Sequence, residues 1–525
     1  MVENTETQKH LKTVVKGAGL IFVGLMFSKI LTYFYRLIIA RYYGPEDYGL
    51  ISIGLSVIGV LVIILLLGMD SGIVRYVSEY RAKNDVKRLK GIIVNPLRIT
   101  LPLSIVVAVL IWFFSPSLAA VFAKDAATQA GLTMIFQILS FTLPFSVFYN
   151  FFLSACKGFQ NMKYSVYTDN IFFSIVLVSS IVVFSLLGFG LAGIAWSYAL
   201  TVIASFLYIL YYFNRRMFNI FGKTKALFEN KDLMRYSIPL FIGSLANIAI
   251  GSFDTIFLGV FKTATDVGIY NAALPTAKFI LVFSIAFGTL FAPIVIEYKT
   301  KKLNQEILSL YRTTTKWIFL SGFPFALLLM FFSRNVLNIL FGAEYASVEA
   351  FSSLSILGMA FFIQSFLMTS TLMLLSIDKT KYTMVDIILA ALINLALNMA
   401  FIPQYGMLGA AVATSISAIF VVLMDSVFAW RFTKMNPLDF KGILKSVFAG
   451  MLSLIFIIVI YRFIGLSASL LTLLPLFFVF LFVYIMQLLV YKALDKNDVF
   501  ILAVLEKKLG VKVKFIRKFV RRFIT

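Results

Sequence analysis

The sequence predicts an all-α polytopic membrane protein with 14 transmembrane helices. Of its 525 residues, 61% are hydrophobic and only 14% are charged, and the mean hydropathy is +0.94. This apolar content exceeds what a soluble fold needs, and it falls in runs of about 20 residues, the length that crosses a bilayer. The two halves of the chain also resemble each other, which predicts two six-helix lobes related by a parallel pseudo-two-fold repeat, plus two extra C-terminal helices.

The apolar runs divide the chain into six segments. They are a cytoplasmic N-terminal tail (1–14), an N-lobe with the first six spans (15–215), a cytoplasmic linker (216–235), a C-lobe with the next six spans (236–432), the last two spans (443–491) and a basic amphipathic tail (498–525). In that tail Phe515, Phe519 and Phe523 recur at i+4 among basic residues, which predicts a helix on the anionic inner leaflet. A flexible basic tail is the alternative.

The distribution of charge predicts the orientation. The net charge of +23 lies in alternate loops between the apolar spans, so it does not indicate nucleic-acid binding. The positive-inside rule then places both termini in the cytoplasm of a multi-pass cell-membrane protein. One cysteine and one histidine exclude an intrachain disulfide, a cysteine metal cluster and a Ser-His-Asp triad. We therefore predict no enzyme activity and no cofactor, apart from a possible coupling ion, Na⁺ or H⁺.

The chain repeats itself at an offset of 216 to 219 residues. The stretch 22–49 returns as 241–268, Glu-Tyr at 79–80 returns at 297–298, and Gly-Leu-Ala-Gly at 190–193 meets Gly-Met-Leu-Gly at 406–409. Each repeat holds six predicted spans, an even number, so the two halves have the same topology. A substrate is expected to bind between such halves near the midplane, with alternating access.

The first span carries two cations on a polar stripe. Lys29, Thr32, Tyr33 and Arg36 fall at i, i+3, i+4 and i+7, which places them on one helix face. Because a cation at mid-bilayer costs roughly 2.5–3.5 kcal/mol, we interpret this stripe as the wall of a polar cavity that binds substrate. The alternative is that the cations pair with carboxylates of other helices, or that one reaches an interface.

The second repeat lacks these cations. At an offset of 219, Lys29 corresponds to Ile248 and Arg36 to Thr255, next to Asp254. The asymmetry suggests a substrate with one anionic end. Arginine offers a fork of donors that suits phosphate, and lysine offers a mobile point charge, whereas both would repel a cationic drug.

Four other charged residues are site candidates. Arg75, at the inner end of the second span, could gate or recruit substrate, or form a local ion pair with Asp70. Lys278 is a second cavity candidate, unless it pairs with Asp254. Asp254 and Asp386 lie inside spans and are the candidates for ion coupling.

The remaining polar residues inside spans have simpler interpretations. Asp425 also qualifies as a site for a coupling ion, but it lies near the inner end of a span, and the alternative is that it only faces water. Asn247, Asn394 and Asn398 are expected to form hydrogen bonds between helices. The glycines at 190–193 and 406–409 are expected to allow close packing at the starts of spans, because no phosphate-loop motif accompanies them.

The layout resembles a known superfamily. The stretch RYYGPEDYG (41–49) after a first span, EYR (79–81) and the duplication with two extra spans resemble the multidrug/oligosaccharidyl-lipid/polysaccharide exporter superfamily. Within it the chain looks most like the polysaccharide flippases, which move undecaprenyl- or dolichol-linked oligosaccharides. The resemblance covers spans one to twelve. The drug-exporting branch usually has twelve spans, so the two extra spans point to the lipid-linked sugar branches.

The resemblance also implies roles for particular parts of the chain. In the related lipid II flippases, the two extra helices are thought to form a groove for the lipid tail, and basic residues line the central cavity. It therefore implies a lipid groove at the last two spans, and a cavity position for Lys29 and Arg36.

These observations lead to one preferred function and two alternatives. The preferred function is a flippase for a polyprenyl-(pyro)phosphate-linked oligosaccharide, with membrane lipids and the glycosyltransferases or polymerase of the same pathway as expected partners. The first alternative is a cation-coupled multidrug exporter of the same superfamily. The second is a membrane glycosyltransferase or polymerase, against which the sequence offers no Asp-x-Asp motif and no large loop.

Overall fold

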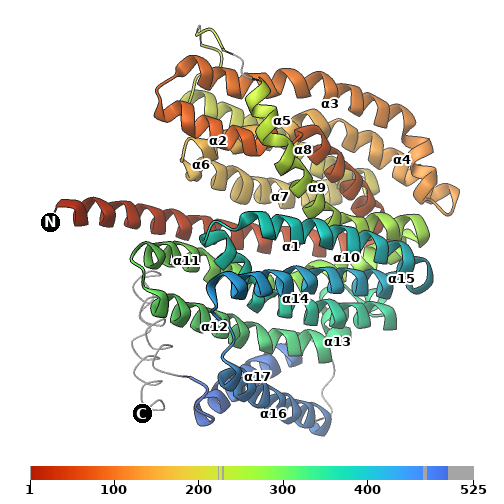
Figure 1. Cartoon of the computed structure of the whole chain (residues 1–525). Helices are drawn as coiled ribbons and strands as arrows, with labels where there is room; N and C mark the ends of the chain where they lie inside the picture. Colours follow the sequence, from red (N-terminus) through yellow and green to blue (C-terminus); the bar gives the residue numbers. More distant parts are fainter. Residues whose placement is uncertain (1, 223, 228–229, 465–469, 495–525) are drawn as a thin grey trace. The chain divides into compact units, whose positions relative to one another are not determined.

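The computed structural model describes residues 2–222, 224–227, 230–464 and 470–494, and all regular structure in these ranges is helical. The predicted tail helix at 498–525 lies outside the described residues. The α-helices, drawn in Figure 1, are α1 (Val2–Leu66), α2 (Met69–Ala82), α3 (Val86–Phe122), α4 (Ala126–Ser140), α5 (Thr142–Gly158), α6 (Met162–Val166), α7 (Phe173–Leu186), α8 (Gly190–Arg216), α9 (Asn230–Phe261), α10 (Ala264–Lys278), α11 (Leu281–Thr300), α12 (Asn304–Phe331), α13 (Ser333–Leu340), α14 (Val348–Ser376), α15 (Thr380–Thr433), α16 (Phe440–Ile464) and α17 (Leu470–Val490). A π-helical turn (Tyr167–Phe172) joins α6 to α7, and a 3₁₀ turn (Ala343–Tyr345) lies between α13 and α14.

The predicted membrane-spanning, all-helical fold is confirmed. Within the described residues, 11 helices are long and apolar enough to cross a bilayer, or up to 12 if the bent pair α4 and α5 is one span. Two of these helical segments, Gly24–Leu66 and Thr380–Thr433, have 43 and 54 residues, more than one crossing needs. Each is interrupted by a glycine with non-helical backbone angles, Gly44 in α1 and Gly406 in α15. The sequence predicts two spans in each segment, and the count of fourteen stays a prediction.

The break in α1 explains the Gly-Pro-Glu-Asp motif. Gly44 has φ 83° and ψ 178°, a conformation that residues with a Cβ rarely adopt. Pro45 follows it and has the fixed φ of a first helical residue, where its missing N–H costs no hydrogen bond. The motif thus ends one helix and begins the next.

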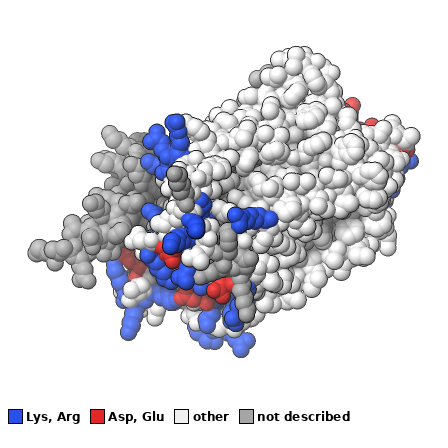
Figure 2. All heavy atoms as spheres, turned by 90° about the horizontal axis from the view of Figure 1, so that it is seen from above, with Lys and Arg blue, Asp and Glu red and all other residues white. Residues whose placement is uncertain are grey.

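The described chain forms two compact units. The first unit comprises Leu20–Ala272 and Ile387–Ala413, and the second contains the described parts of Met1–Gly19, Ala273–Asp386 and Thr414–Thr525. Figure 2 shows Lys, Arg, Asp and Glu side chains gathered on limited parts of the visible surface, while the remaining described surface in that view is uncharged. A charge-free surface of this kind is what lipid contact requires. The lobe boundaries predicted from the sequence stay a prediction.

The backbone repeats at the same offset as the sequence. Residues with positive φ recur 216 to 218 positions apart, so corresponding positions of the two repeats share this uncommon backbone angle. The pairs are Asn84 and Lys302 (φ 53° and 58°), Gln160 and Asp378 (57° and 63°), and Gly190 and Gly406 (58° and 54°). These pairs are evidence for duplication that does not depend on residue identity, since four of the six residues are not glycine.

An ion pair recurs in the same way. Glu79 bonds to Lys83 at 2.6 Å near the end of α2, and Glu297 bonds to Lys301 at 2.5 Å near the end of α11. Both are exposed i, i+4 pairs, so each adds little stability. Their recurrence shows that the two helix ends kept the same local chemistry after duplication.

Two corresponding glycines bring α1 and α10 together within the first unit. A Cβ added at Gly49 would lie 1.7 Å from the carbonyl oxygen of Ala264, and one added at Gly268 would lie 1.8 Å from the carbonyl oxygen of Pro45. Gly49 corresponds to Gly268, and Pro45 to Ala264, at an offset of 219. The contact is therefore reciprocal, as a two-fold repeat requires, and it fixes the helices that carry the polar residues described next.

Candidate substrate and ion sites

Arg36 is positioned by a hydrogen-bonded chain in the first unit. Arg36 lies on α1 with its side chain half-buried, and its Nη1 donates to the hydroxyl of Tyr48 at 2.9 Å. The Tyr48 hydroxyl in turn donates to the backbone carbonyl of Asn271 on α10 at 2.8 Å. Tyr48 is almost fully buried. The guanidinium is therefore held in one direction by a rigid ring, and this bond uses one of its five N–H donors.

The other members of the predicted stripe differ in their surroundings. Lys29 is exposed, and Tyr33 is half-buried. The Thr32 hydroxyl donates to the carbonyl of Ser28 in its own helix, and the Ser28 hydroxyl lies 2.9 Å from that of Ser174 on α7. The stripe thus places Lys29 on an open surface of the unit and Arg36 deeper, next to Tyr48.

Asp254 is the most enclosed carboxylate of the first unit. Its side chain is 0% exposed and accepts hydrogen bonds from Tyr270 Oη at 2.8 Å, Asn398 Nδ2 at 2.7 Å and Asn394 Nδ2 at 3.4 Å. The three donors come from α10 and α15, and Asp254 lies on α9, so the carboxylate joins three helices. Burial of a carboxylate is costly unless donors of this kind surround it.

The predicted roles of the asparagines are met in part. Asn394 and Asn398 bond across helices to Asp254, and Asn398 Nδ2 also donates to Asn394 Oδ1 at 3.0 Å. Asn247 instead donates to the carbonyl of Gly243 within α9. The predicted hydrogen bonds between helices are therefore present for the two asparagines on α15, whereas the bond of Asn247 stays within its own helix.

Asn271 connects the Arg36 chain to the neighbour of Asp254. Its Nδ2 donates to Thr255 Oγ1 at 3.1 Å, and its backbone carbonyl accepts from Tyr48. Thr255 is the repeat counterpart of Arg36, and it lies next to Asp254. The Arg36 guanidinium and the Asp254 carboxylate are thus connected through neighbouring residues of α9 and α10.

Arg75 lies against aromatic rings. Its guanidinium carbon is 4.3 Å from the ring centre of Tyr236 on α9 and 5.5 Å from that of Tyr76. Both distances are in the range of cation–π attraction. Among the described residues no ion pair joins Arg75 to Asp70, so the structure favours an aromatic platform at this position over the local ion pair.

Lys278 and the carboxylates at 386 and 425 belong to the second unit. Lys278 ends α10, with its Nζ 5.9 Å from the ring centre of Phe361. Asp386 is 2% exposed and Asp425 is 0% exposed, so the alternative that Asp425 only faces water is wrong. Its oxygens accept from Thr371 Oγ1 at 2.5 Å and Thr383 Oγ1 at 3.0 Å, because helices α14 and α15 pack around it.

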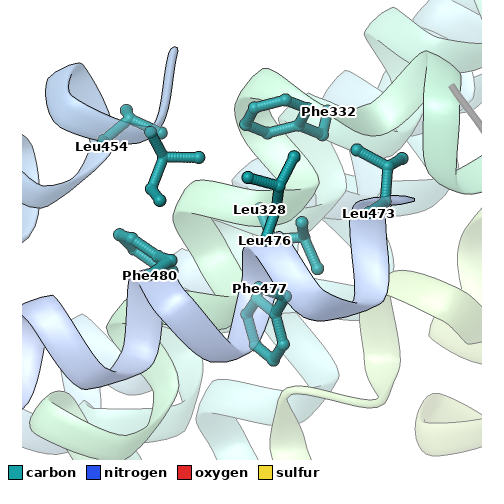
Figure 3. Close-up of a pocket in the computed structure, with 8 residues that line it drawn as sticks. Leu328, Phe332, Leu454, Leu473, Leu476, Phe477 and Phe480 are labelled. Carbon is teal, nitrogen blue, oxygen red and sulfur yellow. The ribbon is translucent and has the colours of Figure 1, made fainter. Parts of the chain in front are cut away.

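The second unit also contains an apolar crevice between α12, α16 and α17. Figure 3 shows it. Its lining is entirely apolar: Leu328, Phe332, Leu454, Ile457, Leu473, Leu476, Phe477 and Phe480. Phe477 packs edge-on against Phe325, with ring centres 5.1 Å apart. The composition of this lining suits a hydrocarbon chain and disfavours charged groups.

Residues 14–299 match the model of a family described as polysaccharide biosynthesis protein, which is more than half of the chain. The chain belongs to the polysaccharide biosynthesis protein family. Residues 239–400 also match the MatE model. This polysaccharide biosynthesis protein is therefore a membrane transporter of the multidrug/oligosaccharidyl-lipid/polysaccharide exporter superfamily, in its polysaccharide flippase branch, as the sequence motifs indicate.

Relatives of this family member support the same placement. It is 23% identical to stage V sporulation protein B of Bacillus subtilis, over 82% of this chain and 85% of that protein. It is 22% identical to a putative O-antigen transporter of Shigella flexneri, over 76% of this chain and 92% of that protein. Among solved structures, the lipid II flippase MurJ in an inward closed conformation matches with a TM-score of 0.69 and 17% identity, over 89% of this chain and 97% of that one. The structural match shows the shared fold.

Several residues that form hydrogen bonds to the charged groups were not predicted from the sequence. Tyr48, Tyr270, Asn271, Thr371 and Thr383 all contact them through hydrogen bonds. Tyr48 lies in the RYYGPEDYG motif, which was a usable signal. The others are single polar residues in apolar helices, and nothing in the one-dimensional pattern pairs them with a particular carboxylate.

Proposed function

We propose that this protein is a flippase that translocates a polyprenyl-(pyro)phosphate-linked oligosaccharide from the inner to the outer leaflet by alternating access. Lys29 and Arg36 bind the anionic head, and Thr32 and Tyr33 bond to sugar hydroxyls. Arg75 recruits the substrate at the inner mouth, and Lys278 is a second cation for the head. The observation that carries the proposal is the Arg36–Tyr48 pair, a guanidinium held in a fixed direction inside an apolar helix.

Phosphate chemistry explains why such a guanidinium is useful. A planar guanidinium forms parallel hydrogen bonds to two phosphate oxygens, and these charge-assisted bonds strengthen where the surroundings are poor in water. The Tyr48 bond removes rotamer freedom before the ligand arrives, so less entropy is lost on binding. Lys29 is exposed on the same helix face and adds a second, mobile positive charge.

The apolar crevice of Figure 3 supports a lipid-linked cargo. A polyprenyl chain must stay in an apolar environment while its polar head crosses the membrane. A crevice at α16 and α17 would hold that chain beside the protein, as the family resemblance implies for the last two spans. A relative that is a putative O-antigen transporter and a structural neighbour that flips lipid II support the same cargo class.

Asp254 and Asp386 are the proposed coupling residues, for Na⁺ or H⁺. Asp254 supports this role because three neutral donors from α10 and α15 surround its carboxylate. Any change in its charge alters hydrogen bonds on three helices, which is the physical requirement for coupling an ion to a conformational change. Asp386 is equally enclosed in the second unit. In this proposal both termini are cytoplasmic, and enzymes of the same glycan pathway supply and use the lipid.

A reconstituted flipping assay tests the proposal. The full chain is placed in liposomes that contain a fluorescent polyprenyl diphosphate-linked sugar, and the label that reaches the outer surface is quenched over time. Arg36→Ala is expected to insert normally and to lose at least about tenfold of the flipping rate, because one charge-assisted hydrogen bond to the head is worth that much. Arg462→Ala, on the exposed end of α16, is the control. Normal flipping by Arg36→Ala would contradict the proposal.

A cation-coupled multidrug exporter is the second candidate, favoured by the MatE match over residues 239–400. The same liposomes distinguish the two functions, since a drug exporter should move a cationic dye along an ion gradient and leave the lipid-linked sugar in place. The two cations of α1 argue against a cationic cargo.

A further inference from the structure

A basic pocket in the second unit lies apart from all the sites described above. Its volume is about 660 Å³. It is formed by the first half of α12, the segment that follows α15, and the first turn of α16. The lining residues are Gln305, Leu308, Ser309, Arg312, Thr313, Lys316, Leu438, Asp439, Phe440 and Lys441.

The α12 side of this basic pocket is one continuous stripe. Its six residues follow each other at alternating spacings of three and one, which places them on one helix face. Lys316 forms the deepest part and is only 3% exposed, whereas Arg312, one turn earlier, is exposed at the rim. The Nε of Arg312 donates to the carbonyl of Asn436 at 3.1 Å, which fixes the guanidinium against the segment that follows α15.

The charges of the basic pocket favour an anion. Arg312, Lys316 and Lys441 are positive, and Asp439 is the only acidic residue among the lining residues. Asp439 lies beside Gly442, where an added Cβ would be 2.3 Å from Asp439 Oδ2 and 3.6 Å from Lys316 Cδ. The carboxylate therefore lies near the stem of Lys316 and compensates part of the charge. The excess positive charge matches a phosphate or diphosphate.

The surroundings of the pocket indicate a lipid as the source of that phosphate. Phe440 is both a lining residue and the first exposed apolar side chain of α16, and it is followed on the same helix face by Leu444 and Phe448 at i+4 and i+8. These three apolar side chains extend from the pocket along α16, which is a candidate membrane span. Basic pockets beside membrane helices are typical sites for phosphate head groups. A soluble anion has no apolar part that could contact Phe440, Leu444 and Phe448.

The distance from the basic pocket to the apolar crevice indicates how long the hydrocarbon chain of the lipid must be. The apolar crevice of Figure 3 lies on the same two helices, at Leu328 of α12 and Leu454 of α16. From Lys316 to Leu328 a helix rises about 18 Å, and from Phe440 to Leu454 about 21 Å. Half of a hydrocarbon core is about 15 Å. An ordinary acyl chain ends near the midplane, whereas a polyprenyl chain reaches the crevice.

We propose that the basic pocket of Arg312, Lys316 and Lys441 is a loading site for the phosphate group of a polyprenyl-(pyro)phosphate lipid. The lipid waits there, on the side predicted to be cytoplasmic, before its head enters the transport pathway. The choice of a polyprenyl lipid rests on the proposed function, whereas the phosphate specificity comes from the pocket itself.

Photolabelling of the full chain tests this site separately from transport. The protein is placed in nanodiscs of neutral phosphatidylcholine with a polyprenyl diphosphate that carries a diazirine near its head, and the labelled peptides are identified by mass spectrometry. Label is expected on the peptides that contain Arg312 and Lys441. The double variant Arg312→Gln/Lys441→Gln should reduce it at least about tenfold. Both residues are exposed, so folding should be preserved, and the protein's elution volume checks this.

Lys445→Gln is the matched control. Lys445 lies one turn after Lys441 on α16, and its Nζ donates to the carbonyl of Lys492 outside the pocket. Labelling of this variant should equal that of the natural protein. Equal labelling of the double variant would overturn the site.

Competition identifies the source of the phosphate. Unlabelled polyprenyl diphosphate should displace the probe, and equal displacement by phosphatidylglycerol or by free pyrophosphate would overturn the assignment to a polyprenyl lipid. A protein that binds the probe in this pocket but does not flip it would support the site and contradict the proposed function. Arg36→Ala should retain the label while losing transport.

Discussion

The reciprocal glycine contact between α1 and α10 allows a quantitative test of how the two repeats meet. In Gly49→Ala the new Cβ would lie 1.7 Å from the carbonyl oxygen of Ala264, where ordinary contact begins at 3.4 Å. The two helices must separate by roughly 1.5 Å, and overpacking of this kind costs about 1–3 kcal/mol. We expect the upper end of this range, because the obstructing atom belongs to the backbone and cannot rotate away.

Gly251→Ala is the matched control. Gly251 is also helical, on α9, and a Cβ there meets nothing within 4 Å. Alanine should therefore be neutral or stabilise this helix by about 0.5–1 kcal/mol, through its higher helix propensity. The two Gly→Ala variants should thus differ by about 2–4 kcal/mol, although they make the same chemical change.

The reciprocity of the contact makes a further prediction. Gly268→Ala meets the carbonyl oxygen of Pro45 at 1.8 Å and should cost as much as Gly49→Ala. Once one substitution has separated the helices, the other should cost less, so the double variant should be less destabilised than the sum of the two single variants. Apparent melting temperatures in one detergent, at one heating rate, provide the measurement. If Gly49→Ala has the same apparent melting temperature as Gly251→Ala, the close contact between α1 and α10 is not present in the protein.

Three other predictions concern single side chains. Asp254→Asn should preserve the fold but abolish the dependence of flipping on the ion gradient, and an unchanged dependence would remove Asp254 from the coupling site. Tyr48→Phe removes only the hydroxyl that orients the Arg36 guanidinium. It should therefore weaken substrate binding by about three- to tenfold, which titration with the lipid measures. The backbone N–H of Thr128 lowers the pKa of Asp125 from its ordinary 3.8. The stability from this helix cap is therefore present above pH 3.8 and lost in acid. Because asparagine also caps a helix but does not titrate, the decrease in melting temperature on acidification should be smaller in Asp125→Asn than in the natural protein.

The fold was largely predictable because its signals are local and repeated. Long apolar runs identify membrane helices without knowledge of their partners, since lipid demands helical backbone. The duplication was visible in stretches such as 22–49 and 241–268, and the structure adds corresponding left-handed residues such as Asn84 and Lys302. The sequence also predicts two spans on either side of Gly44 and of Gly406, and the structure shows a backbone break at each glycine.

The candidate sites were less predictable because their partners are distant in the chain. The cost of burying charge points to Asp254, but it does not reveal that its donors come from residues such as Asn398, 144 positions away. The sequence left the surroundings of Asp425 open for a similar reason, since its position near a span end allowed contact with water, while Thr371 and Thr383 enclose it in the structure. The basic pocket at Arg312 was missed, because loop cations near spans ordinarily report only orientation.

The two repeats share backbone features but differ in charge at the position of Arg36. Arg36 and Thr255 occupy corresponding positions, and a chain through Tyr48 and Asn271 connects them. A ligand that draws the guanidinium away from Tyr48 also alters the bond to the Asn271 carbonyl on α10. The preceding residue of α10 is Tyr270, whose hydroxyl holds the Asp254 carboxylate.

If Arg36 binds the substrate and Asp254 the coupling ion, as proposed, both events act on the same turn of α10, which gives a direct physical route for coupling. Tyr48→Phe interrupts this route without removing a charge. In that variant, the ion gradient should change the affinity for the lipid less than it does in the natural protein. An unchanged effect of the gradient in Tyr48→Phe would show that coupling follows another route.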